Sequence, residues 1–134
     1  MKEVRSRPVA EYALLLMLTF AKRLRESFDL QRGKRWQRLG LHELHERTLG
    51  IVALGSIGSE IARLARTFGM TTVATRSDTG AGRTVPVDEL LPSNRLADLL
   101  RRSDYVVLTA PSTPETFHLI GGPELEAMRH RGAD

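Results

Sequence analysis

The feature that most constrains this sequence is a glycine-bounded turn between a short apolar run and an amphipathic stretch. The apolar run covers 49–54 and is typical of a strand buried on both faces. Residues 55–58 form the turn, and a helix is predicted over 57–68, ended by Gly69. A second apolar strand is expected over 70–75. Strand, turn, helix and strand at this spacing form a βαβ unit, which implies a parallel sheet.

The rest of the chain continues the alternation of helices and strands. We expect one helix over 9–28, opened by Pro8 at its first position, and a polar connecting loop over 29–46. After the βαβ unit, the pattern predicts a short strand, a helix, a further strand and a last helix, at 85–87, 96–102, 105–109 and 123–128. The chain is therefore expected to be one α/β unit over 1–134, with a helix-and-loop part over 1–46 and a core over 47–134.

Glycines at this point of a βαβ unit are typical of a dinucleotide phosphate site. In the pattern G-x-G-x-x-G, backbone N–H groups at a helix N-terminus approach a pyrophosphate through a turn with little room for side chains. This chain has the second glycine, Gly55, and the third, Gly58, which would allow close packing of the helix on the strand, but Ala53 stands at the first position. An alanine there costs stability only where the backbone needs a positive φ or leaves no room for a methyl group. The residues expected at the phosphate are Gly55, Ser56, Ile57 and Gly58, and an ordinary strand–turn–helix corner is the alternative.

The end of the second strand bears on which dinucleotide would bind. An NAD site normally has Asp or Glu about 20 residues after the glycines, where it accepts hydrogen bonds from the ribose 2′-hydroxyl. This sequence has Arg76 and Ser77 there, and a guanidinium with a hydroxyl attracts a 2′-phosphate. They favour NADP over NAD, with NAD still possible. Asp78 would reverse the preference if the register were shifted by two residues, and a surface arginine without a cofactor role is the remaining alternative.

Composition excludes several other kinds of site. The chain has no cysteine, which excludes disulfides, thiolate metal sites and a cysteine nucleophile. Its net charge of +4 is spread along the chain, and the densest basic segment, 32–38, is expected to be a solvated loop. Aromatic residues are few for a nucleic-acid stacking surface. The apolar run over 12–21 is too short to cross a membrane, which needs roughly 20 apolar residues. We expect a cytoplasmic protein with no metal, nucleic-acid or membrane partner.

Several segments in order resemble the D-isomer-specific 2-hydroxyacid dehydrogenases. The closest stretch is the glycine turn with the helix after it, through Phe68-Gly69-Met70. The other matching segments are Pro8-Val9-Ala10-Glu11-Tyr12, Gly33-Lys34-Arg35-Trp36, Thr48-Leu49-Gly50-Ile51-Val52, Leu99-Leu100-Arg101-Arg102-Ser103-Asp104, Pro111-Ser112-Thr113-Pro114-Glu115-Thr116, and Glu124-Leu125 with Met128. The resemblance implies an NAD(P)-binding domain of that family, with a Rossmann-type doubly wound parallel sheet that is incomplete at its C-terminal side.

The resemblance also implies roles for individual residues. Ser56 and Ile57 would meet the pyrophosphate, and Arg76 and Ser77 the adenosine ribose or its 2′-phosphate. The residues implied to line the path to the nicotinamide are Ala110, Pro111 and Thr116. The family's catalytic Arg, Glu and His, and its substrate domain, would come from sequence beyond this chain, so the chain is expected to be inactive alone. A homodimer is implied through the helix over 9–28, whose middle is apolar on nearly all sides.

Three functions remain in competition. The first is the cofactor-binding portion of an oxidoreductase that transfers a hydride between NADP(H) and a 2-hydroxy or 2-oxo acid. The second is a non-catalytic nucleotide-binding or dimerisation module that keeps the fold without the chemistry. The third is a nucleic-acid binder centred on 32–38, for which a steep salt dependence of binding would be required. The residues favour the first.

Overall fold

The computed structural model describes residues 2–78, 84–110 and 119–128, with side chains from Arg5 onward. The elements in chain order are α1 (Lys2–Ala21), α2 (Leu24–Arg32), β1 (Thr48–Val52), α3 (Ser56–Thr67), β2 (Thr71–Arg76), β3 (Glu89–Pro92), the short 3-10 turn η1 (Ser93–Arg95), α4 (Leu96–Arg102), β4 (Tyr105–Leu108) and α5 (Gly122–Ala127). The βαβ unit predicted from the glycine turn is therefore present as β1–α3–β2.

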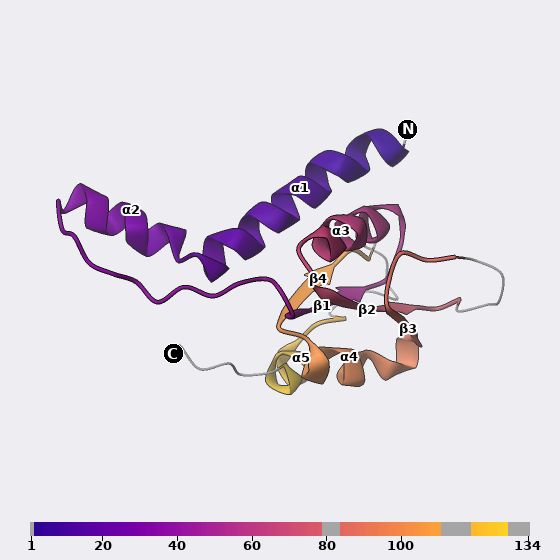
Figure 1. Cartoon of the computed structure of the whole chain (residues 1–134). Helices are drawn as coiled ribbons and strands as arrows, with labels where there is room; N and C mark the ends of the chain where they lie inside the picture. Colours follow the sequence, from indigo (N-terminus) through magenta and orange to yellow (C-terminus); the bar gives the residue numbers. More distant parts are fainter. Residues whose placement is uncertain (1, 79–83, 111–118, 129–134) are drawn as a thin grey trace.

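The strands form one four-stranded parallel sheet in the order β3-β2-β1-β4. Helices α1 and α3 lie over one face of the sheet and α4 and α5 lie under the other (Figure 1). From β1, the chain adds β2 and then β3 on one side of the sheet, and it then adds β4 on the other side of β1. The switch point therefore lies between β1 and β4, where ligands of such sheets bind at the carboxyl ends of the strands. The predicted α/β parallel fold is confirmed.

Each face of the sheet has its own hydrophobic core. Between the sheet and α3 with α1, the buried side chains include Leu14, Met17, Leu49, Ile51 and Ile61. Beneath the other face the buried residues are Val52, Val73, Leu91, Leu99 and Leu100. Because β1 and β2 are covered on both sides, most of their residues are buried. This explains the continuous apolar run of β1, while β2 buries Thr72 and Thr75 beside its apolar residues.

The predicted N-terminal helix over 9–28 is wrong in its bounds. Helix α1 starts at Lys2 and includes Pro8, which does not open it. It ends at Ala21, and α2 begins at Leu24 after Arg23 adopts a left-handed backbone with φ 49°. Part of the predicted loop over 29–46 is thus helical. The break allows α2 to leave the direction of α1, so α2 extends beyond the sheet while α1 packs on α3 (Figure 1). We call the two helices together the arm.

The predicted third strand over 85–87 is also wrong. The strand that pairs with β2 is β3, and its register places Val73 beside Glu89 and Arg76 beside Pro92. The carboxylate of Asp88 accepts a hydrogen bond from the Thr72 N–H at 2.8 Å, and the Asp88 N–H donates to the Thr72 carbonyl at 3.1 Å. These bonds fix the start of pairing after residue 87. Pro86 has no N–H to donate to a ladder, which disfavours a strand there.

One side of the arm is buried and the other is open. Ala10, Leu14, Met17 and Ala21 face the core, whereas Tyr12 is 61% exposed and Phe20 is 73% exposed. The remaining exposed apolar residues of this surface are Val9, Leu15, Leu16, Leu24 and Phe28. We call these seven residues the outer arm face. Helix α2 packs mainly against α1 and buries none of its own residues.

Candidate functional site

The glycine turn connects β1 to the first turn of α3 at the carboxyl edge of the sheet. Gly55 is the residue before the helix, and no side chain caps the helix start. The first-turn N–H groups of a helix have no acceptor within the helix, so a backbone start of this kind suits an anion. A Cβ built on Gly55 would meet nothing within 4 Å, so the space in front of the turn is open.

Gly58 has a different task in the same turn. A Cβ there would lie 2.9 Å from Ile51 Cγ2 and 3.2 Å from Thr109 Oγ1. Only a residue without a side chain lets α3 approach β1 this closely. The predicted role of Gly58 in close packing of helix on strand is confirmed.

Ala53, at the position of the missing first glycine, has a left-handed backbone with φ 66°. This is the conformation in which an alanine is disfavoured relative to glycine. Two threonine hydroxyls hold its peptide groups. The Ala53 N–H donates to Thr75 Oγ1 at 3.2 Å. The single proton of the Thr109 hydroxyl is shared between the carbonyls of Ala53 at 2.9 Å and Val52 at 3.0 Å.

A cavity of about 510 Å³ opens beside the turn. Its walls come from the turn and α3, from the end of β2, and from the segment before β3. The lining residues are Leu54, Gly55, Ser56, Ser59, Arg63, Arg76, Thr84, Val85 and Pro86. Two arginines and three hydroxyl-bearing residues therefore line one space that also has an apolar wall.

Arg63, which lines this cavity, forms an ion pair with Glu60 on the same helix. Arg63 donates to Glu60 Oε2 at 2.8 Å, and Glu60, whose side chain is only 18% exposed, is also 3.7 Å from Arg7. A guanidinium has five N–H donors, so this single bond leaves Arg63 able to bind an anion. Arg66, one turn further along α3, lies 3.8 Å from Asp88 and does not line the cavity.

The predicted site residues are brought together only in part. Gly55, Ser56 and Arg76 line the cavity, while Ile57 is half-buried in the first turn of α3. Ser77 is exposed just after β2 and Ala110 is half-buried after β4, and neither lines it. Pro111 and Thr116 lie outside the described residues. The competing Asp78 is exposed and is not among the lining residues, whereas Arg76 is.

Sequence reasoning missed several residues of this region, among them Ser59, Arg63, Thr75 and Thr109. Ser59 and Arg63 lie three and seven positions after Ser56, which places all three on one helical face above the turn, and this spacing could have revealed them. Thr75 and Thr109 lie at the ends of neighbouring strands, but their hydroxyl bonds to Ala53 depend on the packing of the sheet. No local pattern in the sequence indicates those bonds.

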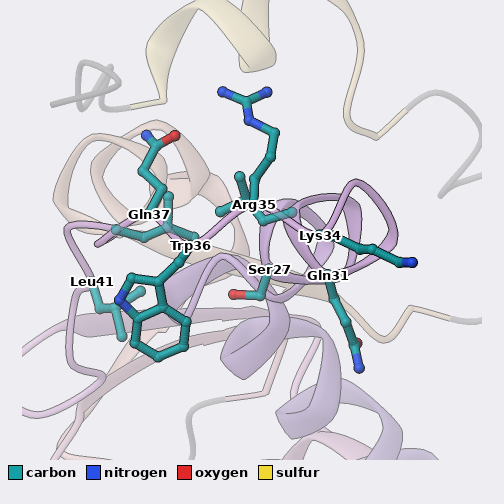
Figure 2. Close-up of a pocket in the computed structure, with 9 residues that line it drawn as sticks. Ser27, Gln31, Lys34, Arg35, Trp36, Gln37 and Leu41 are labelled. Carbon is teal, nitrogen blue, oxygen red and sulfur yellow. The ribbon is translucent and has the colours of Figure 1, made fainter.

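A second cavity, of about 660 Å³, lies between α2 and the loop after it. Its lining includes Lys34, Arg35 and Trp36 from the basic segment, and Trp36 is fully exposed. Figure 2 shows the cationic ends of Lys34 and Arg35 pointing in different directions. The two charges do not converge on a common point, so this cavity lacks the arrangement that binds a phosphate.

Within 2–78, 84–110 and 119–128, no group of three or more His, Asp or Glu side chains could hold a metal ion. None of the helices in those ranges has the length and apolar character needed to span a bilayer. His45 packs over Gly69, where a Cβ would collide with its ring.

The parallel sheet, the switch point and the glycine turn define a Rossmann-type dinucleotide-binding domain. Residues 14–133 match the family model described as D-isomer specific 2-hydroxyacid dehydrogenase, NAD binding domain. The chain therefore belongs to this family, as part of its NAD-binding domain.

Named relatives support the same membership. A glyoxylate reductase of Thermococcus gammatolerans is 36% identical, over 95% of this chain and 40% of the relative. A D-3-phosphoglycerate dehydrogenase of Dictyostelium discoideum is 32% identical, over 92% of this chain and 30% of the relative. The crystal structure of a glycerate dehydrogenase related protein from Thermoplasma acidophilum superimposes with a TM-score of 0.86 at 31% identity, covering 95% of this chain and 43% of that one. The chain thus spans about two fifths of the length of such relatives.

Proposed function

We propose that this chain is the cofactor-binding portion of an NADP-linked oxidoreductase that acts on a 2-hydroxy or 2-oxo acid. The observation that carries the proposal is the cavity beside the glycine turn, where Arg76 and Arg63 face the same space as Ser56. Two guanidinium groups favour the doubly charged 2′-phosphate of NADP over the ribose hydroxyl of NAD. NAD binding with lower affinity is compatible with the same turn.

Each part of the site would have a separate task. The open backbone at Gly55 and Ser56, with Ile57 and Gly58 in the first helical turn, would hold the pyrophosphate. Arg76, Ser77 and Arg63 would hold the 2′-phosphate, and Val85 with Pro86 would cover the adenine on its apolar side. The segment after β4, with Ala110, Pro111 and Thr116, would lead toward the nicotinamide.

The reaction would be a hydride transfer, which the nicotinamide ring supplies when it is bound. Several relatives are named glyoxylate reductase, and glyoxylate is a 2-oxo acid, so we propose the same class of substrate here. The catalytic Arg, Glu and His that the family resemblance implies would come from sequence beyond this chain, together with the substrate domain. On this proposal the chain binds the cofactor but does not turn over substrate alone.

The test is a calorimetric titration of the purified chain with NADPH and with NADH. We expect tighter binding of NADPH, and we expect Arg76→Asp to weaken NADPH binding by roughly tenfold to a hundredfold, as for a lost charge-assisted hydrogen bond. Arg66→Asp is the matched control, because Arg66 is an exposed arginine nearby that does not line the cavity. Equal binding of the two cofactors, or of neither, would refute the proposal.

The outer arm face supports a homodimer through α1 and α2. Seven exposed apolar side chains from adjacent helices form a surface of the kind that a soluble protein covers with a partner. A second copy of the chain is the partner that the family resemblance implies. This surface also supports the second candidate function, a dimerisation module without chemistry. For either function we propose a cytoplasmic location, because a chain without cysteine suits a reducing compartment.

A further inference from the structure

We propose that Thr75 and Thr109 are positioning residues that hold Ala53 in its left-handed conformation and thereby fix the phosphate-facing turn. The conformational half of this inference stands on the structure alone. The half that concerns ligand affinity rests on the proposed function.

The hydrogen bonds to Ala53 define its conformation from both sides. Its N–H belongs to the peptide plane before the Cα and is held by Thr75 Oγ1. Its carbonyl belongs to the plane after the Cα and is held by the Thr109 hydroxyl. Since φ and ψ are the rotations of these two planes, fixing both planes fixes a backbone that a Cβ disfavours.

The two threonines are themselves held in place. Thr75 is buried, and its carbonyl accepts a hydrogen bond from the Leu54 N–H at 2.8 Å. The Thr109 N–H donates to the Val52 carbonyl at 3.1 Å, which extends the pairing of β4 with β1. Both side chains are β-branched and therefore have few rotamers. Each hydroxyl thus comes from a fixed point at the end of a strand next to β1.

Thr109 also connects Ala53 to the start of α3. Its hydroxyl oxygen lies 3.2 Å from the position that a Cβ of Gly58 would occupy. One hydroxyl therefore lies close to both Ala53 and the first turn of α3. A glycine at position 53 would adopt the same φ without help, so we infer that the clamp compensates for the alanine.

The test is a comparison of Thr109→Val with and without Ala53→Gly, using two probes. NADPH contains the pyrophosphate, whereas adenosine 2′-monophosphate reaches only the end of the site formed by Arg76. We expect Thr109→Val to weaken NADPH binding about tenfold, the effect of one well-made hydrogen bond, and adenosine 2′-monophosphate binding less than about twofold.

Thr109→Ser, which keeps the hydroxyl, should restore NADPH affinity. In the A53G background the same Thr109→Val change should weaken NADPH binding less than about threefold. Thr75→Val should behave like Thr109→Val.

Thr67→Val is the matched control, because Thr67 is an exposed threonine at the far end of α3 whose hydroxyl bonds only to the local Leu64 carbonyl at 2.6 Å. An equal loss of both probes, or an equal NADPH loss in both backgrounds, would overturn the inference.

If the wild-type chain binds neither probe, the proposed function fails but the clamp is still tested by urea unfolding. Thr109→Val should then lower the unfolding midpoint less in the presence of Ala53 than in the A53G background, because a strained alanine relaxes once its clamp is lost whereas a glycine has no strain to release. Equal shifts in the two backgrounds would overturn the clamp itself.

Discussion

Gly50 and Gly55 differ in the space that surrounds them. This difference predicts whether an alanine there would affect folding or ligand binding. A Cβ on Gly50 would collide with the Ser103 side chain and lie 2.6 Å from Leu99 Cδ2, because β1 is in close contact with α4. A Cβ on Gly55 would enter open space, and φ at Gly55 is −139°, which any residue adopts. Packing therefore requires a glycine at position 50, whereas packing does not require one at position 55.

We therefore expect opposite results from two alanine substitutions. Gly50→Ala should lower the free energy of unfolding by about 1–3 kcal/mol through overpacking. Gly55→Ala should change it by less than about 0.5 kcal/mol but should weaken NADPH binding, because the methyl group stands where the pyrophosphate approaches. Urea unfolding and calorimetry on the same samples give both quantities. A Gly55→Ala variant that binds NADPH normally would show that the turn does not contact phosphate.

At the scale of single residues, the sequence predicts a backbone conformation or a close contact where the residue type alone requires it. Gly58 and Gly69 were predicted correctly, since close packing and a helix end with positive φ each require a glycine. The conformation of Ala53 could not be predicted, because it depends on hydroxyls that follow it by 22 and 56 positions. Contacts over such separations exist only once the sheet has formed.

At the scale of the elements, an ion pair connects strand β3 to helix α4. Glu89 at the start of β3 bonds to the guanidinium of Arg102 at the end of α4, and this bond lowers the pKa of the Glu89 carboxyl below its usual value of 4.5. Burial of the carboxyl opposes the shift weakly, and both side chains are 44% exposed. The pair ties an edge strand to the helix beneath it.

The pair predicts a small, pH-dependent stabilisation. Because the folded-state pKa of Glu89 is lowered, its contribution is present above the unfolded pKa and disappears as the pH falls through the folded-state pKa. Glu89→Gln should lower the free energy of unfolding by at most about 0.5 kcal/mol near neutral pH, as for an exposed ion pair, and by nothing in strong acid or molar salt. Arg102→Gln should cause the same loss, and the double variant no additional loss. A loss that persisted in strong acid would contradict the ion-pair explanation.

The elements of the core were more predictable than those around it. The bounds of β1, α3, β2 and α4 follow from apolar runs, a helical period and glycine punctuation, all of which are local. The arm was predicted as one helix because apolar residues continue across Lys22 and Arg23, where no glycine or proline marks the break. The third strand was misplaced because β-branched residues at 85 and 87 have strand propensity, while Asp88 decides where pairing starts.

For the whole molecule, the uneven burial of the arm leads to a prediction about association. Leu15→Glu together with Phe20→Glu should convert a dimer into a monomer, because charges would replace apolar contacts at the centre of the outer arm face. Sedimentation measures the change. Leu125→Glu, at a comparably exposed leucine of α5, is the matched control and should leave the assembly unchanged. A wild-type chain that sediments as a monomer and unfolds cooperatively would refute the proposed dimer.

The left-handed break at Arg23 has one more consequence for the whole molecule. The segment from Arg23 to Arg38 carries six Arg and Lys side chains, and α2 has no buried residue. Trypsin cuts after such residues wherever the backbone can open locally, and an exposed helix with few tertiary contacts opens at little cost. This arm is therefore where the polypeptide should be cleaved first, and the rate of that cleavage should fall whenever another surface covers it.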